Sequence, residues 1–363
     1  MAAREFDETL LERPGAGGAA ARAAASAGAH VRAGRAAALD ADTGVLEALG
    51  RPRALVLAGS GAEAVAADVA AAALGPGCPV PVQVVRGRGL PGWVGAADLV
   101  VAVSGRAGPA ADPVAACAAE AVRRGCALAA AGPSDGPLAA LAEQSRGVYA
   151  PLRGPATLWG PVGAALALAS AAGVPAPSAE DVEAAAARMD EVAAACAPSV
   201  ESWENEAKTL AADLAGTLPL ACGSTPEAAA AARCFAARAA AVAAYPVLAV
   251  SLPEGLGTAA TALSGPLGAE GPRSIFDDPV EDAGVRLHPV VLEDPDGGPD
   301  AEADLAALQD AAHAAGARVS RVSTGPGERM ERLAGLIALT DYATVYLAAA
   351  YQVETAADEP SQG

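Results

Sequence analysis

Ala54-Leu-Val-Leu-Ala-Gly-Ser-Gly-Ala-Glu-Ala-Val-Ala-Ala-Asp68 is the stretch that decides the fold. Its first four residues are apolar and predict a buried strand, while its alanine-rich second half predicts a helix. Between them, Gly59, Ser60 and Gly61 predict a tight turn. Backbone N–H groups converge in such a turn, and the helix dipole adds partial positive charge. We therefore expect these three residues to contribute to a binding site for an anion.

The same pattern returns about 160 residues later, in Leu218-Pro-Leu-Ala-Cys-Gly-Ser-Thr-Pro-Glu227. Ser224 or Thr225 can cap a helix whose first residue is Pro226. Two strand–turn–helix units in one chain suggest a duplicated α/β protein.

Length and charge restrict the classes of function. The chain has 363 residues, only 3% of them aromatic, so its cores must be built from small aliphatic side chains. Its formal net charge is −19. An acidic surface repels nucleic acid and anionic membranes, so neither is an expected partner. Any phosphate ligand must then be held by local donors rather than by the overall field of the protein.

The chain offers no pattern of a metal centre, a cofactor or a secretion signal. Its six cysteines show no CxxC pair and no histidine at metal-ligand spacing, which favours buried thiols in a reducing cytoplasm. The most apolar window, 333–351, is interrupted by Thr340 and Asp341 and predicts a buried helix rather than a membrane span. We expect Asp341 to be buried and paired, with Arg329 or Arg332 as its partner.

Strands alternate with helices in two parts of the chain, and this order predicts two doubly wound parallel sheets, each flanked by helices. The predicted strands of the first sheet are 54–57, 80–85, 99–103, 127–131 and 147–150, with helices at 62–74, 110–124 and 136–145. Those of the second sheet are 218–222, 247–252, 287–292 and 319–322, with helices at 226–243, 302–315 and 328–351.

The domain organisation follows from this alternation. We expect a helical N-terminal lead-in of the kind that embraces a second subunit, a first domain, linking helices, a second domain and a disordered tail. The corresponding ranges are 1–50, 51–155, 156–217, 218–353 and 354–363.

A second glycine-bearing turn follows the third predicted strand, at Ser104-Gly105-Arg106. In a flavodoxin-like strand order this turn lies beside the first one, at the carboxyl edge of the sheet where ligands bind. Two facing turns predict a pocket of phosphate size. The alternative is that Ser104 and Gly105 only turn the chain.

The last predicted helix carries a more specific pattern. Asp341-Tyr342 followed by Val345-Tyr346-Leu347-Ala348 resembles the final helix of the bifunctional phosphoglucose/phosphomannose isomerases, which contain paired sugar-isomerase (SIS) domains. Glu206-Ala-Lys-Thr-Leu-Ala211 and Leu252-Pro253-Glu254 are similar to that family too. The resemblance implies two flavodoxin-like SIS domains, a sugar-phosphate ligand and a homodimer.

The catalytic groups of that family do not carry over. Aldose–ketose isomerisation needs a base that moves a proton between C1 and C2. The family places a glutamate in an Asn-Glu-Asn-type segment, whereas 235–244 holds no carboxylate here. The family histidine after Pro-Glu is missing, and so is its C-terminal lysine. Glu254 and His288 remain as candidate catalytic residues; a surface carboxylate and a core histidine are the alternatives.

The phosphate anchors differ as well. Glu63 stands where the family has a serine hydroxyl, and a carboxylate there repels phosphate unless the ligand is a cation such as an amino sugar. In the second turn only Ser104 keeps a family hydroxyl, with Ala102 and Ala107 at the other two positions. Arg106 is the residue that could compensate, because a guanidinium grips phosphate with two donors.

Three functions stay open at this point. The chain is a sugar-phosphate-binding SIS protein that has lost isomerase activity, an active isomerase with relocated catalytic groups, or a structural dimeric partner of another enzyme.

Overall fold

The computed structural model describes residues 5–13, 16–105, 112–154, 157–268 and 285–353. By its internal contacts the chain divides into two compact units. The first unit comprises Ser26–Arg188 and Glu328–Glu331; the second comprises Met1–Ala25, Met189–Gly327 and Arg332–Gly363. The predicted tail at 354–363 lies outside the described residues.

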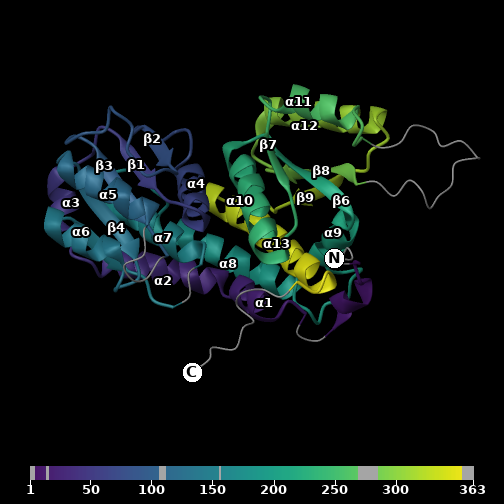
Figure 1. Ribbon diagram of the computed structural model, residues 1–363, viewed down its shortest axis with the longest axis horizontal. Coiled ribbons are helices and arrows are strands. Elements are labelled where there is room, and N and C mark those ends of the chain that lie inside the picture. Colours follow the sequence, from purple (N-terminus) through teal and green to yellow (C-terminus); the bar gives the residue numbers. More distant parts are fainter. Residues whose placement is uncertain (1–4, 14–15, 106–111, 155–156, 269–284, 354–363) are drawn as a thin grey trace, which may run out of the picture. The chain divides into compact units, whose positions relative to one another are not determined.

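The first unit is built on a five-stranded parallel sheet (Figure 1). Its strands lie in the order β2-β1-β3-β4-β5, the flavodoxin-like order of a doubly wound sheet. In register, Leu55 of β1 lies between Val82 of β2 and Leu99 of β3. The predicted parallel sheet is therefore confirmed. The strand bounds are β1 (Leu55–Ala58), β2 (Val82–Val85), β3 (Leu99–Val103), β4 (Ala127–Gly132) and β5 (Val148–Pro151).

Helices cover both faces of this sheet, because parallel strands need crossover connections. Helices α5 and α6 pack on one face and bury a cluster that includes Val100, Cys117 and Leu128. Helices α4 and α7 pack on the other face, and α2 packs along α7. The helix bounds are α2 (Ala27–Leu39), α3 (Gly44–Leu49), α4 (Ala62–Leu74), α5 (Pro113–Arg123), α6 (Pro137–Ser145) and α7 (Trp159–Ala171), followed by α8 (Ala179–Ala195).

Helices α2 and α7 approach so closely that glycine is required where they cross. A Cβ atom on Gly34 would lie 1.9 Å from the carbonyl oxygen of Gly160, and one on Gly163 would lie 2.3 Å from that of Val31. Neither distance is compatible with a side chain. The crossing of α2 and α7 is thus packed by direct contact between the two backbones, without bulky side chains between them.

The second unit repeats the pattern with four parallel strands in the order β7-β6-β8-β9. These strands have the same neighbours as the first four of the other sheet, β2-β1-β3-β4. The repeated topology agrees with the duplication predicted from the sequence. The strand bounds are β6 (Thr217–Gly223), β7 (Leu248–Ser251), β8 (Arg286–Glu293) and β9 (Ser320–Ser323).

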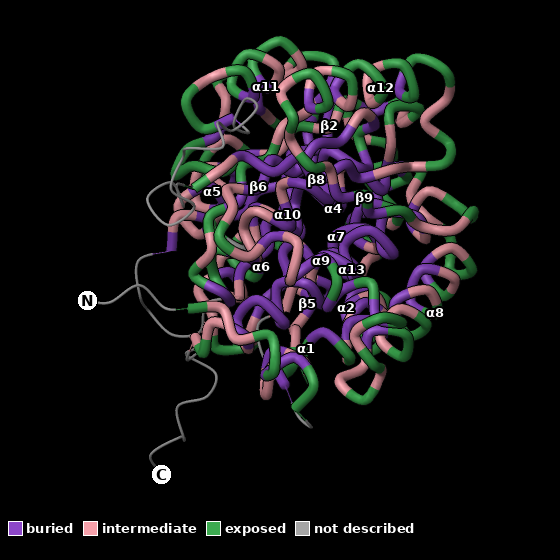
Figure 2. Tube along the Cα trace, turned by 90° about the vertical axis from the view of Figure 1, so that its right-hand side faces the viewer, coloured by how far each residue is buried: buried purple, intermediate pink, exposed green. Residues whose placement is uncertain are grey.

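Helices also surround this second sheet. Helix α10 packs on β6 and β7, while α11 and α12 pack on each other and enclose a cluster with Leu220, Val291 and Leu308. In Figure 2 the strands β6 and β8 run through buried trace, whereas α8, α11 and α12 carry exposed segments. The helix bounds are η1 (Glu8–Glu12, a 3-10 helix), α1 (Gly18–Ala25), α9 (Glu206–Leu214), α10 (Pro226–Ala243), α11 (Leu256–Leu263), α12 (Gly298–Ala314) and α13 (Arg329–Ala350).

Helix α13 is long and apolar enough to cross a membrane, but 89% of its apolar window is buried inside the protein. The hydroxyl of Tyr346 donates to the carbonyl oxygen of Cys196 at 2.6 Å. Asp341 is paired, as predicted, but its partner is Arg238 of α10 at 2.7 Å and neither Arg329 nor Arg332. The core packing of α13 agrees with the prediction of a buried helix.

Candidate functional site

The first glycine turn lies at the carboxyl end of β1, where the fold places ligands. A Cβ atom on Gly59 would lie 2.3 Å from the carbonyl oxygen of Glu63, so only glycine fits between β1 and the first turn of α4. Gly61 precedes α4 with a φ of 63°, a conformation that favours glycine. Strand β3 pairs with β1 up to Ala102, which brings Ser104 and Gly105 beside this turn.

Glu63 links the two turns. Its Oε1 atom accepts the backbone N–H of Gly105 at 2.9 Å. An N–H group at this position is one of the donors that the sequence assigns to a phosphate. A carboxylate of the chain itself therefore occupies the place expected for the anion.

The Ser104 hydroxyl also has a hydrogen-bond partner within the protein. This hydroxyl, which is buried, donates to Oδ2 of Asp112 at 2.7 Å. The other carboxylate oxygen of Asp112 accepts the N–H of Val114 at 2.9 Å and so caps α5. The structure thus brings Glu63, Ser104 and Gly105 together, but the Gly105 N–H and the Ser104 hydroxyl already donate to carboxylates of the chain, Glu63 and Asp112. Arg106 lies outside the described residues.

A cavity of about 550 Å³ opens beside the second turn. Its walls are helix α2, the carboxyl ends of β3, β4 and β5, and the first turn of α7. Ser104 and Gly105 line it, whereas Gly59, Ser60, Gly61 and Glu63 do not. The volume falls within the range of small-molecule sites in proteins. The candidate site is therefore displaced from the glycine turn of β1 toward β5.

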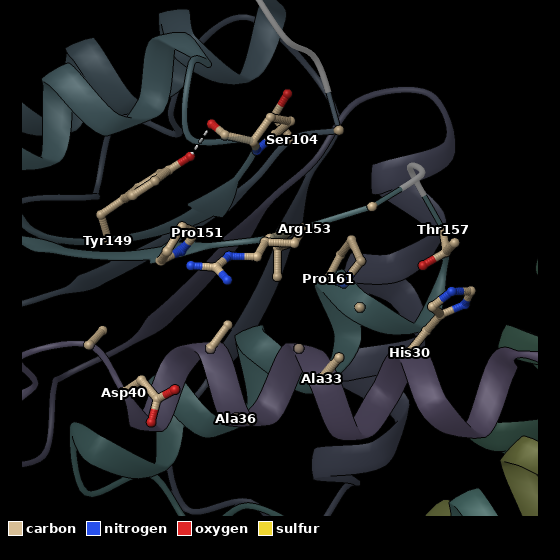
Figure 3. A pocket seen from close by; sticks show the side chains of 18 residues that line it. His30, Ala33, Ala36, Asp40, Ser104, Tyr149, Pro151, Arg153, Thr157 and Pro161 are labelled. Carbon is tan, nitrogen blue, oxygen red and sulfur yellow. Dashed lines mark hydrogen bonds between the residues drawn. The ribbon is translucent and has the colours of Figure 1, made fainter.

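Four polar side chains of this cavity, His30, Asp40, Arg153 and Thr157, form no hydrogen bond or ion pair with any residue that the structure describes. In Figure 3 the Arg153 side chain extends between Pro151 and Pro161, and His30 points from α2 toward Thr157.

The hydroxyl of Tyr149, in contrast, donates to the carbonyl oxygen of Pro133 at 2.6 Å. Burial and the nearby charge of Asp135 raise the pKa of Tyr149 to about 12, so this phenol stays neutral.

These side chains give the cavity two distinct chemistries. The guanidinium of Arg153 can hold an anion with two parallel donors. Burial lowers the pKa of His30, so its imidazole is neutral at pH 7 and can either donate or accept a hydrogen bond. Sequence reasoning missed His30, Asp40 and Arg153. The position of Arg153 two residues after β5 was the available signal, because ligands gather where parallel strands end.

In the second unit, Glu254 and His288 lie apart. Glu254 is exposed and follows β7, whose last residue, Ser251, is level with Leu292 of β8. His288 precedes Leu292 by four residues, which is about 13 Å along a strand. The structure therefore does not bring the two candidate catalytic residues together.

His288 is buried within the sheet and is satisfied there. Its Nε2 atom lies 2.8 Å from Oγ of Ser320, whose hydroxyl donates to Asp213 at 3.0 Å. Burial lowers the pKa of His288, Asp213 counteracts this shift, and Arg318 adds to it. These contacts match the core-histidine alternative.

At the carboxyl edge of the second sheet, the polar side chains form hydrogen bonds and an ion pair within the protein. Thr225 caps α10 by accepting the N–H of Ala228 at 3.1 Å, as the sequence predicts, and donates to Asp294 at 3.0 Å. Asp294 also pairs with the buried Arg332 at 2.6 Å. Across the described ranges, no group of three or more His, Cys, Asp or Glu side chains could hold a metal ion.

The family model of the bacterial phospho-glucose isomerase C-terminal SIS domain matches residues 203–359. No curated relative matches the chain in sequence. Solved structures share the fold across almost the whole chain. The C-terminal domain of glucosamine-fructose-6-phosphate aminotransferase from Francisella tularensis has a TM-score of 0.64 at 11% identity, covering 92% of this chain and 96% of that one.

Two further structures agree. Tagatose-6-phosphate ketose/aldose isomerase from Escherichia coli has a TM-score of 0.58 at 16% identity and covers 92% and 90% of the two chains. A glucose-6-phosphate isomerase like protein from Thermus thermophilus has a TM-score of 0.52 at 20% identity and covers 84% and 83%. Residues 203–359 are thus similar to an SIS domain of bacterial phosphoglucose isomerase, and the chain as a whole has the fold of SIS-domain phosphosugar isomerases.

Proposed function

We propose that this protein binds a sugar phosphate or a related carbohydrate derivative through the cavity beside β5, and that it acts by binding or regulation rather than by isomerisation. The proposal includes SIS domains at 51–155 and 218–353 and a homodimer, as in the bifunctional isomerases that the sequence resembles. It also includes a cytoplasmic location, for which six free thiols are the support.

The observation that carries the binding proposal is the cavity with Arg153. Arg153 has no ion-pair partner among the described residues and extends over the cavity, where it can grip a phosphate. His30 and Thr157 add hydrogen-bonding groups for sugar hydroxyls. Phosphosugar proteins of the same fold support this class of ligand.

The lack of isomerisation is proposed from the arrangement of titratable groups. His30 and Asp40 line the cavity from α2 and its C-terminal end. Ten residues separate them, or about 15 Å along a helix. The two cannot act together on adjacent carbons of one sugar. In the second unit, Glu254 and His288 are similarly separated.

Two assays test the proposal. In a coupled assay, fructose 6-phosphate should give no glucose 6-phosphate above the enzyme-free rate. In a thermal-shift assay, a panel of phosphosugars should raise the unfolding temperature, because a ligand that binds the native state stabilises it.

The variant Arg153→Ala should lose the thermal shift, while Arg88→Ala, an exposed arginine outside the cavity, should keep it. Enzyme-like turnover in the coupled assay would instead favour an isomerase with relocated groups. A panel without any stabilising ligand would favour a structural partner of another enzyme.

A further inference from the structure

The cavity that holds Arg153 also holds a carboxylate. Asp40 lines it from the end of α2 and forms no ion pair with a described residue. Arg153 lines the same cavity from the loop that follows β5. In Figure 3 the two side chains lie on different walls, with Asp40 at the end of α2 and Arg153 above the helix. A cation and an anion thus share one cavity without neutralising each other.

Asp40 is exposed, and its position at the end of a helix is mildly unfavourable for a carboxylate. Asp40 is the C-terminal cap of α2, and its backbone N–H bonds to the carbonyl oxygen of Ala36. The last turn of a helix carries partial negative charge, which favours a cation and disfavours an anion. Asp40 adds to that negative charge instead of balancing it. A positively charged group in the cavity would balance both the Asp40 carboxylate and the partial negative charge of the helix end.

The wall between the polar groups is small and apolar. Ala33, Gly34, Ala36 and Ala37 line the cavity along α2 between His30 and the helix end. These residues offer no side-chain donor or acceptor. Charge recognition in this cavity is therefore assigned to Arg153 and Asp40 among the described residues.

We propose that the ligand carries both charges, as an amino-sugar phosphate does, with its phosphate on Arg153 and its ammonium group on Asp40. This inference rests on the proposed function, because it names the ligand class of the same cavity. It also explains how the negative charge at the C-terminal end of α2 is balanced, since an ammonium group there would interact with both the Asp40 carboxylate and the helix dipole.

Isothermal titration with three probes tests the inference: glucosamine 6-phosphate, glucose 6-phosphate and N-acetylglucosamine 6-phosphate. Glucosamine 6-phosphate should bind about fivefold more tightly than the other two, because only its amino group is charged. In Asp40→Asn this preference should vanish, while the affinity for glucose 6-phosphate stays the same or rises. Raising the pH through the titration of the amino group should remove the preference in the wild-type protein.

Asp42→Asn is the matched control. Asp42 lies two residues away, does not line the cavity, and accepts the N–H of Gly44 through an oxygen that asparagine retains. This variant should keep the preference. Equal affinities for all three probes in the wild-type protein would overturn the inference but leave the proposed function intact. Binding of none of them would overturn the proposed function itself.

Discussion

At the scale of single residues, Glu63 distinguishes the first glycine turn of this protein from a simple phosphate-binding turn. Its carboxylate accepts the N–H of Gly105, which is the kind of donor that a phosphate uses. The sequence alone predicts that a glutamate at this position repels an anion. The hydrogen bond could not be predicted, because it depends on how two loops from neighbouring strands meet.

The variant Glu63→Gln tests this role. Glutamine keeps an oxygen for the N–H of Gly105 but removes the negative charge. We expect phosphosugar affinity to rise by about 1 kcal/mol, or roughly fivefold, as repulsion at the second turn is lost. Isothermal titration measures the change. Glu143→Gln, an exposed position on α6, serves as the control, and an unchanged affinity in Glu63→Gln would show that Glu63 does not oppose the ligand.

Asp98 determines part of the pH dependence of stability. Its buried carboxylate receives two hydrogen bonds from Arg53, at 2.6 and 2.9 Å, and one from Gly95 at 2.8 Å. The Arg53 bonds lower the pKa of Asp98 below 3.8, burial opposes this shift, and the Gly95 N–H adds to it. A lowered pKa stabilises the fold above pH 3.8, and this stabilisation is lost as the pH falls through the folded-state pKa.

Asp98→Asn should therefore lower the free energy of unfolding by about 2 kcal/mol at pH 7. The difference from the wild-type protein should shrink as the pH falls below 3.8, the ordinary value for aspartate. Urea unfolding at a series of pH values measures it. A difference that is constant with pH would mean that the charge of Asp98 contributes nothing.

At the scale of elements, strands and crossover helices were predictable because apolar runs and alanine-rich stretches alternate along the chain. Helix α11 was missed. Gly255 is its N-cap and Gly257 lies in its first turn, and glycine disfavours helix, yet Ala259 and Leu263 are buried in the core of the second unit. Tertiary packing thus outweighed local preference.

The candidate cavity was only half predictable. The strand-end rule indicated Ser104 and Gly105, but α2 was interpreted as a lead-in to a second subunit. Its contribution of His30 and Asp40 depends on how α2 packs along α7, and the sequence alone does not reveal that contact.

The structural role of Lys208 was not predicted from the sequence either. It is the only lysine of the chain, and nothing beside it in the sequence indicates a structural role. It is fully buried, and its ammonium donates to the carbonyl oxygens of Pro198 and Val200 and to Glu12. A flexible point charge with three donors matches these three acceptors.

Gly163→Val tests the crossing of α2 and α7. The new side chain would meet the carbonyl oxygen of Val31, so the helices must separate. We expect a loss of about 3 kcal/mol or more in the free energy of unfolding, as for other overpacked cores. Urea unfolding of the variant measures this. Gly77→Val, at an exposed glycine where a Cβ atom would meet no atom within 4 Å, is expected to cost less. Equal losses would indicate that backbone contact is unimportant here.

At the scale of the whole molecule, two parallel sheets with the same strand order give the chain the fold of SIS-domain phosphosugar isomerases. Fold does not determine activity, which depends on the groups placed in the site. Here the donors beside β1 and β3 are held by Glu63 and Asp112, and the charged groups of the cavity lie on different elements. The function that we propose for this arrangement is phosphosugar binding without proton transfer.

Deuterium exchange reports on proton transfer itself, since isomerisation moves a proton between C1 and C2 of the sugar. Glucose 6-phosphate or mannose 6-phosphate is incubated with the protein in D₂O, at concentrations for which binding has been demonstrated, and deuterium at C2 is followed by NMR. We expect incorporation no faster than in the protein-free control. Incorporation at an enzyme-like rate, about 1 per second or more for each protein chain, would contradict the account.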